Sequence, residues 1–186
     1  MKMVMTAVLG LALAASARAE TPEGRERFSA FAVDLYGATF GGRTSTVQVT
    51  VDRWSTPEDR RALEILFEEK GPDALLDAIR KMKPIGRIHT PGSVGYDLRF
   101  AYQTPLANGA RRIVIGTDRP LSFYEASQRP RSADYPFTVL DMRVDANGRG
   151  QGSMVVASRV LAMGETIEIE NYGTTAVKLM QVRLDR

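Results

Sequence analysis

The chain has 186 residues, a formal net charge of +3, one histidine and no cysteine. The lack of cysteine excludes disulfide bonds, a thiol nucleophile, a thiolate metal site and a lipid-modified N-terminal cysteine. A chain of this length is expected to form one domain with a core large enough to fold without such crosslinks.

Residues 1–19 have the three parts of a secretory signal peptide. Lys2 precedes a short apolar run over residues 4–15, and Ala17-Arg18-Ala19 is a small-x-small site, so we expect cleavage after Ala19. The apolar run is shorter than the ~20 residues of a membrane-spanning helix. The alternative is a retained N-terminal anchor or a buried helix. Export predicts a soluble protein in the periplasm or outside the cell.

Cleavage changes the charge balance. The segment carries Lys2 and Arg18 and no acidic residue, so 23 of the 25 basic residues remain beside 22 acidic ones, a net charge of +1. The arginines alternate with acids, as in Asp52-Arg53, which is typical of a solvated surface and not of a basic stripe that binds nucleic acid. We expect no nucleic-acid partner and no stable membrane span after cleavage. Residues 20–27 are polar and are expected to be a mobile leader.

Residues 28–186 are predicted to form a single β-rich domain. A strand over residues 28–36 leads through Gly41-Gly42 into a half-buried strand in which Val47, Val49 and Val51 alternate with polar residues.

The period of two is then interrupted. Ser55-Thr56-Pro57-Glu58 has the pattern of a capping box with proline early in the first turn. Two helices are predicted over residues 57–70 and 73–82, because Gly71-Pro72 separates two amphipathic stretches. They would form an inserted helical hairpin over about residues 57–82.

The second half of the chain returns to strands. Single strands are predicted over residues 84–90, 96–103 and 112–117; in the second, Tyr96, Leu98, Phe100 and Tyr102 alternate with Asp97, Arg99, Ala101 and Gln103. Two hairpins pair residues 136–145 with 152–161, around the turn residues Asn147-Gly148, and residues 166–172 with 176–184. Short connections favour antiparallel pairing. The predicted fold is mostly β: an antiparallel β-sandwich or β-barrel of about eight strands with the helical hairpin inserted. An outer-membrane barrel fits the length, but the strands are polar and lack aromatic girdles.

His89 lies in the stretch RIHTPGSVGYD, beside Ser93 and Asp97. A nucleophile elbow reads G-x-S-x-G, and this stretch is one residue out of register with it. The Pro-Gly pair favours a turn, with His89 at a strand end and Ser93 in the turn. One histidine and no cysteine give no zinc site, and no glycine-rich cofactor fingerprint is present. We therefore predict no catalytic residue, no metal site and no cofactor.

Residues 117–137 form an unusual loop rich in arginine, tyrosine and proline. Arginine beside aromatic rings can bind a carboxylate, a phosphate or a sugar face. The candidate binding residues are Arg119, Tyr124, Arg129, Arg131 and Tyr135, together with His89. In the alternative interpretation the arginines bond to backbone carbonyls and pair with Asp118 and Asp134, which locks the loop. Trp54, the only tryptophan, is interpreted as part of the core.

Four stretches together carry a resemblance: GGRTSTVQVTVDRWSTPEDR, TPGSVGYDLRFA, TDRPLSFYEA and RSADYPFTVLDMRVDANGRGQG. Over roughly residues 40–184 the chain resembles a group of secreted, β-rich bacterial proteins of unknown function. The resemblance implies an exported bacterial protein and no particular catalytic residue, substrate or cofactor.

The leading functional hypothesis is an exported, non-enzymatic β-domain that binds a small apolar or amphipathic ligand or a cell-envelope partner such as an envelope protein. A filled core would exclude the small ligand and leave a protein-interaction or structural role. One alternative is a hydrolase in which His89 converges in one cleft with carboxylates drawn from Asp97, Asp118, Glu125 and Asp134. The other is a structural protein of the envelope that assembles through an exposed strand edge. The oligomeric state is left open.

Overall fold

The computed structural model describes residues 24–33, 44–119, 137–163, 166–171 and 177–185. The elements of the first half are β1 (Glu26–Val33), β2 (Thr44–Val51), α1 (Pro57–Lys81), β3 (Gly86–His89), β4 (Tyr96–Leu98) and β5 (Phe100–Pro105). Those of the second half are the 3-10 turn η1 (Ala107–Gly109), β6 (Arg111–Thr117), β7 (Phe137–Val144), β8 (Arg149–Met163), β9 (Thr166–Asn171) and β10 (Val177–Asp185).

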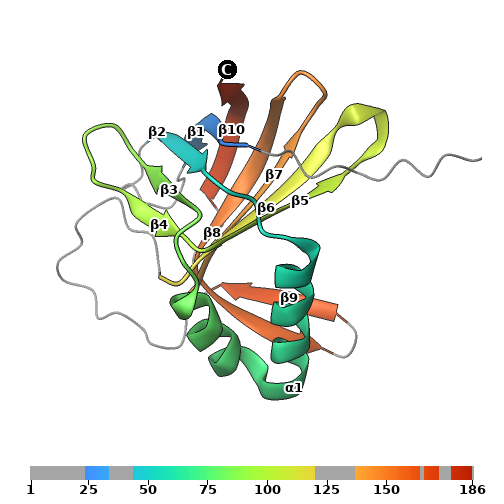
Figure 1. Cartoon of the computed structure of the whole chain (residues 1–186). Helices are drawn as coiled ribbons and strands as arrows, with labels where there is room; N and C mark the ends of the chain where they lie inside the picture. Colours follow the sequence, from blue (N-terminus) through green and yellow to red (C-terminus); the bar gives the residue numbers. More distant parts are fainter. Residues whose placement is uncertain (1–23, 34–43, 120–136, 164–165, 172–176, 186) are drawn as a thin grey trace, which may run out of the picture.

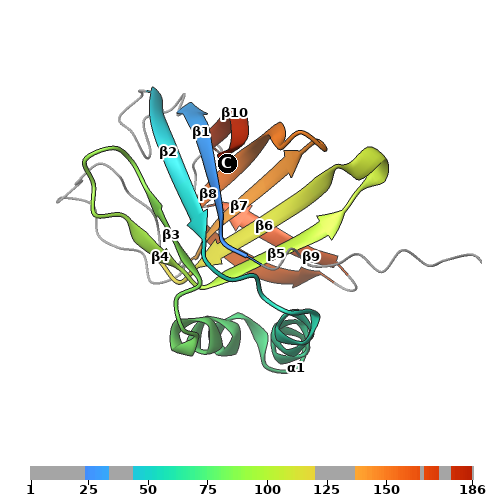
Figure 2. The ribbon, with the colours of Figure 1, turned by 45° about the horizontal axis from the view of Figure 1, so that its top comes forward.

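Nine of these strands form an antiparallel sheet that curls into a nearly closed barrel (Figures 1 and 2). Their order is β4-β3-β2-β1-β10-β8-β7-β6-β5, and β9 pairs with the far half of β8. The predicted fold class is confirmed. Short connections account for the antiparallel pairing of β3 with β4, β5 with β6 and β7 with β8.

The two ends of the sheet belong to one extended segment, residues 96–105, which changes partner at Arg99. Before Arg99, β4 pairs with β3, and after it β5 pairs with β6. Residues 52–55 fill the remaining seam. The N–H of Ser55 donates to the carbonyl of Ala101, and the Oγ of Ser55 accepts from the N–H of Ala101. These contacts cover a strand edge that would otherwise be open.

This change of partner shifts the alternation predicted for residues 96–103. Leu98 and Ala101 are both fully buried in the barrel core, so the alternation skips one residue between them. Phe100 and Tyr102 consequently lie on the outer side, where their rings stack with centroids 6.4 Å apart. The prediction of one apolar face along this strand was wrong after Leu98, because a single strand serves two neighbours.

The barrel is filled by its own side chains. Within the described chain, twenty apolar residues from the strands and the seam form one cluster, and none is more than 5 % exposed. Phe28, Leu140 and Met142 are among the largest, each at 1 % or less. A water-sized cavity among these side chains would leave accessible surface on its lining. The interior is therefore a packed core.

Helix α1 begins at Pro57, as predicted, and Thr56 and Asp59 form its capping box. Thr56 is the N-cap: its Oγ1 accepts from the N–H of Asp59 at 3.1 Å, and the Asp59 carboxylate accepts from the N–H of Thr56 at 2.9 Å. Ser55 instead binds the barrel seam. Gly71 (φ 78°, ψ −171°) breaks the helix before Pro72, so the two predicted helices are the two segments of α1, which Figure 2 shows at a sharp bend.

The segments of α1 lie below the barrel in Figure 1. Phe67, Leu75, Leu76 and Ile79 of the helix form a second apolar cluster with Phe137 of β7. This cluster lies outside the barrel core and attaches the helix to the sheet. Within the described residues, no helix has the length and apolar character needed to cross a membrane.

One predicted hairpin is confirmed and the other is wrong. β7 pairs with β8, and the turn between them is closed by Asp145, whose Oδ1 accepts from the N–H groups of Asn147 and Arg149. Gly148 supplies the left-handed conformation of that turn (φ 73°). In contrast, β10 pairs with β1 and β8, and among the described residues β9 pairs with β8 alone. β9 and β10 both pair with the long strand β8, which the local sequence pattern did not reveal.

Candidate functional site

The structure describes two of the six predicted binding residues. His89 is the last residue of β3, and Arg119 follows β6. The other four, Tyr124, Arg129, Arg131 and Tyr135, lie outside the described residues, as do Glu125 and Asp134 of the hydrolase alternative. A binding role for the loop therefore stays a prediction.

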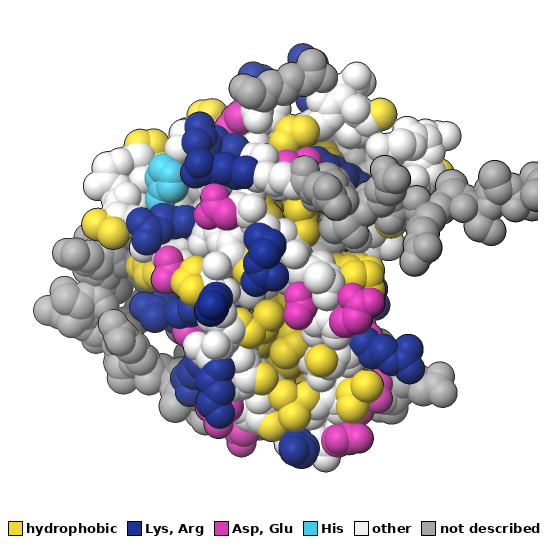
Figure 3. Space-filling view, in the orientation of Figure 1, with side chains coloured by type: hydrophobic (Ala, Val, Ile, Leu, Met, Phe, Trp, Pro, Cys, Tyr) yellow, Lys and Arg dark blue, Asp and Glu magenta, His cyan; other side chains and the backbone are white. Residues whose placement is uncertain are grey.

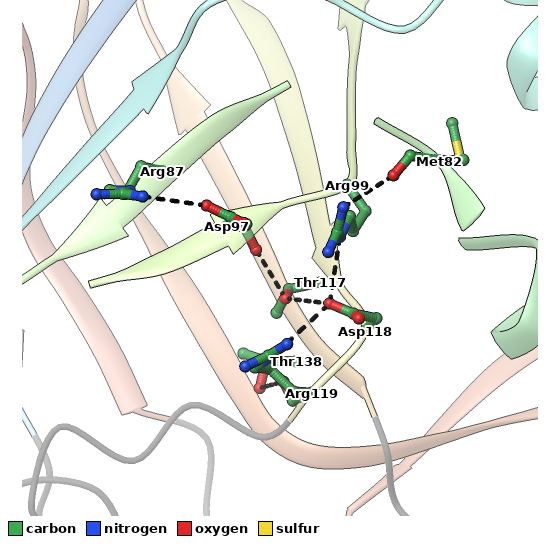
Figure 4. A network of polar contacts seen from close by, with 8 residues as sticks. All are labelled: Met82, Arg87, Asp97, Arg99, Thr117, Asp118, Arg119 and Thr138. Atoms are coloured by element: carbon green, nitrogen blue, oxygen red, sulfur yellow. Dashed lines mark hydrogen bonds and ion pairs between the residues drawn. The ribbon is translucent and has the colours of Figure 1, made fainter. Parts of the chain in front are cut away.

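A network of polar contacts crosses the junction of β4 and β6, where the predicted binding loop begins (Figure 4). Asp118 is at its centre, with its side chain 9 % exposed. Its Oδ1 lies 3.5 Å from the Nε of Arg99 and 3.8 Å from the Nε of Arg119. Arg99 also donates to the carbonyl of Met82 at 2.9 Å, which links the network to the end of α1.

The network continues to both sides of Asp118. The Oγ1 of Thr117 donates to the carbonyl of Asp97 at 3.0 Å, and the Asp97 carboxylate lies 3.4 Å from the Nη2 of Arg87. The Oγ1 of Thr138 donates to the carbonyl of Arg119 at 3.2 Å. Asp97 and Asp118 thus each have an arginine partner. Thr117 and Thr138, at the two ends of the loop, each donate a side-chain hydrogen bond to a backbone carbonyl. For Arg119, this geometry agrees with the alternative interpretation, in which it pairs with Asp118.

His89 does not join this network. Among the described residues, its Nδ1 lies 3.4 Å from the carbonyl oxygen of Thr90. Ser93 is engaged in the turn, where its Oγ accepts from the N–H of Thr90 and donates to the carbonyl of Thr90. Gly92 and Gly95 have the positive φ angles of that turn. The strand-end and turn interpretation agrees with this arrangement, and neither Asp97 nor Asp118 is brought to His89.

A second polar cluster lies inside the barrel, near the end that carries the β5–β6 and β7–β8 turns (upper end in Figure 1). We call Glu26, Phe28, Trp54, Gln103 and Arg111 the mouth cluster. Arg111 is its centre and is 18 % exposed. Its Nη1 donates to the Oε1 of Glu26 at 3.1 Å and to the Oε1 of Gln103 at 2.8 Å. Its Cζ lies 5.7 Å from the ring centroid of Phe28 and 6.0 Å from that of Trp54, within cation–π range.

The mouth cluster is incompletely hydrogen-bonded. In the described chain, three buried side-chain atoms have no hydrogen-bond partner: the Oε2 of Glu26, the Nε1 of Trp54 and the Nε2 of Gln103. The Oε2 of Glu26 does lie 2.9 Å from the Nη2 of Arg111, an ion-pair distance, but without hydrogen-bond geometry. All three atoms belong to residues around Arg111. Because native proteins pair nearly all buried polar atoms, their concentration at one place marks this cluster as a candidate site.

No protein-family model, curated protein or solved structure matches this chain. Its function must therefore be argued from its own residues. Among the described residues, no group of three or more histidine, aspartate and glutamate side chains could hold a metal ion.

The sequence pattern did not reveal the mouth cluster. Arg111 and Gln103 lie near strand ends, where a polar side chain is usually solvated. The shifted alternation of β5 places Gln103 on the same side as the buried Ala101, and the pairing of Arg111 with the buried Val144 places that arginine inside the barrel. The prediction that Trp54 belongs to the core is confirmed, since it is 5 % exposed.

The outer wall carries ion pairs of a different kind. A bidentate contact with Asp141 raises the pKa of Arg112, and a hydrogen bond from Arg60 to Glu64 raises the pKa of Arg60, whose guanidinium also covers the Tyr102 ring. Both guanidinium groups therefore stay protonated throughout the physiological pH range. Figure 3 shows basic and acidic side chains interspersed over the face that it presents, and apolar ones gathered in its lower middle.

Proposed function

We propose that the chain is an exported, non-enzymatic β-barrel domain that binds a polypeptide of the cell envelope and does not enclose a small molecule. The packed interior carries this proposal. The twenty core side chains that are at most 5 % exposed leave no room for the apolar part of a ligand. The sequence left open whether the domain binds a small ligand or an envelope partner, and the packing supports the envelope partner.

The arrangement of the ionisable groups supports a role without catalysis. A hydrolase needs a base held within hydrogen-bond reach of its partners. The described carboxylates of the hydrolase alternative, Asp97 and Asp118, are held by arginines, and His89 contacts a backbone carbonyl. These contacts stabilise the junction of β4 and β6 and leave the described groups apart from one another.

Exposed apolar side chains on the barrel wall support a contact with another protein. Phe31 of β1 and Met180 of β10 are direct cross-strand neighbours, and they are 48 % and 51 % exposed. A bulge places Gln181, beside Met180, at a positive φ of 51°, which is uncommon for a residue other than glycine. Exposed apolar pairs of this kind are suited to the buried centre of a protein interface.

Crosslinking in intact cells tests the proposal. Cells that produce the protein are treated with a short amine-reactive crosslinker, and the chain is then isolated under denaturing conditions. We expect a discrete adduct larger than the chain that has lost its signal peptide, with a polypeptide as the second component. F31S/M180S should lose the adduct, whereas T44A, a change at an exposed position of β2, should retain it. An adduct unaffected by F31S/M180S would place the contact elsewhere, and a chain isolated only with a small molecule would contradict the proposal.

A further inference from the structure

We propose that the mouth cluster is a carboxylate-binding site, and that Glu26 occupies the place of the ligand's carboxylate in this structure. The partner's carboxylate would bind Arg111, while Glu26 turns out toward solvent. The proposal deepens the proposed function, on which it rests for the source of that carboxylate. The chemistry of the site itself can be tested with free carboxylates.

The composition of the site suits a carboxylate ligand. Arg111 presents a planar fork of donors, the group that best matches a carboxylate. The rings of Phe28 and Trp54 lie within 6.0 Å of its Cζ and hold the guanidinium in a fixed, largely desolvated position. A fixed guanidinium inside the mouth of a barrel is suited to binding an anionic group that arrives from solvent.

The present occupant satisfies the site incompletely. The Oε1 of Glu26 accepts one hydrogen bond from Arg111, and its Oε2 lies 2.9 Å from the Nη2 of Arg111 without hydrogen-bond geometry. The N–H of Trp54 and the amide N–H₂ of Gln103 also lack acceptors. An unpaired buried polar group destabilises the folded state, and here such groups gather at one place.

Exchange of carboxylates would give the unpaired donors of Trp54 and Gln103 an acceptor. A ligand carboxylate with two free oxygens can accept from Arg111 and also from the donors of Trp54 and Gln103. Glu26 begins β1 and keeps 17 % of its side chain exposed, so it is positioned to turn toward water, where its Oε2 is hydrated. The packed core beneath Phe28 admits only the carboxylate end, and the rest of the ligand stays outside the barrel.

Trp54 supplies the readout, because it is the only tryptophan and belongs to the site. Purified protein is titrated with propionate and, separately, with propionamide, which has the same shape without the charge, at constant ionic strength. We expect a saturable change of Trp54 fluorescence with propionate and none with propionamide. E26Q removes the competing charge at nearly constant size and should bind propionate at least about tenfold more tightly, a difference of about 1.4 kcal/mol.

Two neighbouring arginines provide matched variants. R111Q should abolish the response, whereas R112Q should keep it, because Arg112 lies on the outer wall against Asp141. If R111Q does not fold, E26Q decides: propionate should raise its thermal midpoint more than that of the wild type. An equal response to propionamide, no saturable response in either wild type or E26Q, or a response retained in folded R111Q would overturn the site. Because these titrations need no partner, their failure would leave the crosslinking result to decide the proposed function separately.

Discussion

Gly150 shows how closely the barrel backbone is packed. A Cβ at this position would lie 1.8 Å from the carbonyl oxygen of Arg143 on the neighbouring strand, a distance that no rotamer change can relieve. At Gly116 a Cβ would find its nearest described neighbour, the Cβ of Phe100, at 3.9 Å. The two glycines therefore differ in the space around them and not in their type of element, since both lie in strands.

G150A should consequently destabilise the protein by at least about 1–3 kcal/mol, the usual cost of overpacking, because the backbone of β7 or β8 must shift. G116A should change the free energy of unfolding by less than about 1 kcal/mol. Urea denaturation followed by circular dichroism measures both. Equal stability of the two variants would show that β7 and β8 do not approach as closely as described.

Asp118 and Asp97 form a second contrast between single residues. The Asp118 side chain is 9 % exposed and lies between two arginines, whereas that of Asp97 is 40 % exposed. D118N should lower the free energy of unfolding by about 1.5–3 kcal/mol, because Arg99, at 16 % exposure, loses a charged hydrogen-bond partner. D97N should cost less than about 1 kcal/mol, as for other exposed ion pairs. Chemical denaturation that gives D97N the larger loss would contradict this account of the β4–β6 junction.

Individual residues were predictable where the local pattern decides their environment. Val47, Val49 and Val51 alternate with polar residues, and all three are buried. Arg111 was not predictable in this way, because its position inside the barrel depends on which strands meet at the mouth. The core role of Trp54 could be predicted, but its unpaired N–H could not, since that follows from the arrangement of Gln103 and Arg111 around it.

Helix α1 depends on one backbone conformation. Gly71 has φ 78° and ψ −171°, a combination that is essentially confined to glycine, and a Cβ there would meet no atom within 4 Å. G71A should therefore cost about 1–3 kcal/mol through backbone strain alone. G116A serves as the glycine control in the same denaturation experiment. A G71A variant as stable as the wild type would show that the two segments of α1 do not need this bend.

Elements with a local signal were well predicted. The break at Gly71-Pro72 and the turn at Asn147-Gly148 both follow from residues that favour unusual backbone angles. The predicted pairing of β9 with β10 was wrong. A turn between two strands is a local feature of the sequence, whereas the pairing of both strands with β8 is not. The seam residues 52–55 were missed for the same reason, since Ser55 acts on a residue far along the chain, Ala101.

Closure of the barrel produces both the packed core and the mouth cluster. The antiparallel class was predictable from short connections, but closure depends on residues 96–105 serving two strands at once. Closure gives a core with no space for a ligand and, at one end, a mouth that holds an arginine with incompletely paired neighbours. The packed core and the incompletely paired mouth are the basis of both proposals.

Mass spectrometry of the protein gently purified from its native envelope fraction, first under native and then under denaturing conditions, tests whether the barrel encloses a ligand. The packed core predicts that the chain has the same mass under both conditions, apart from any polypeptide partner that dissociates. A discrete small-molecule mass that is retained under native conditions and lost on denaturation would contradict the account, because such a molecule would need space that the described core does not offer.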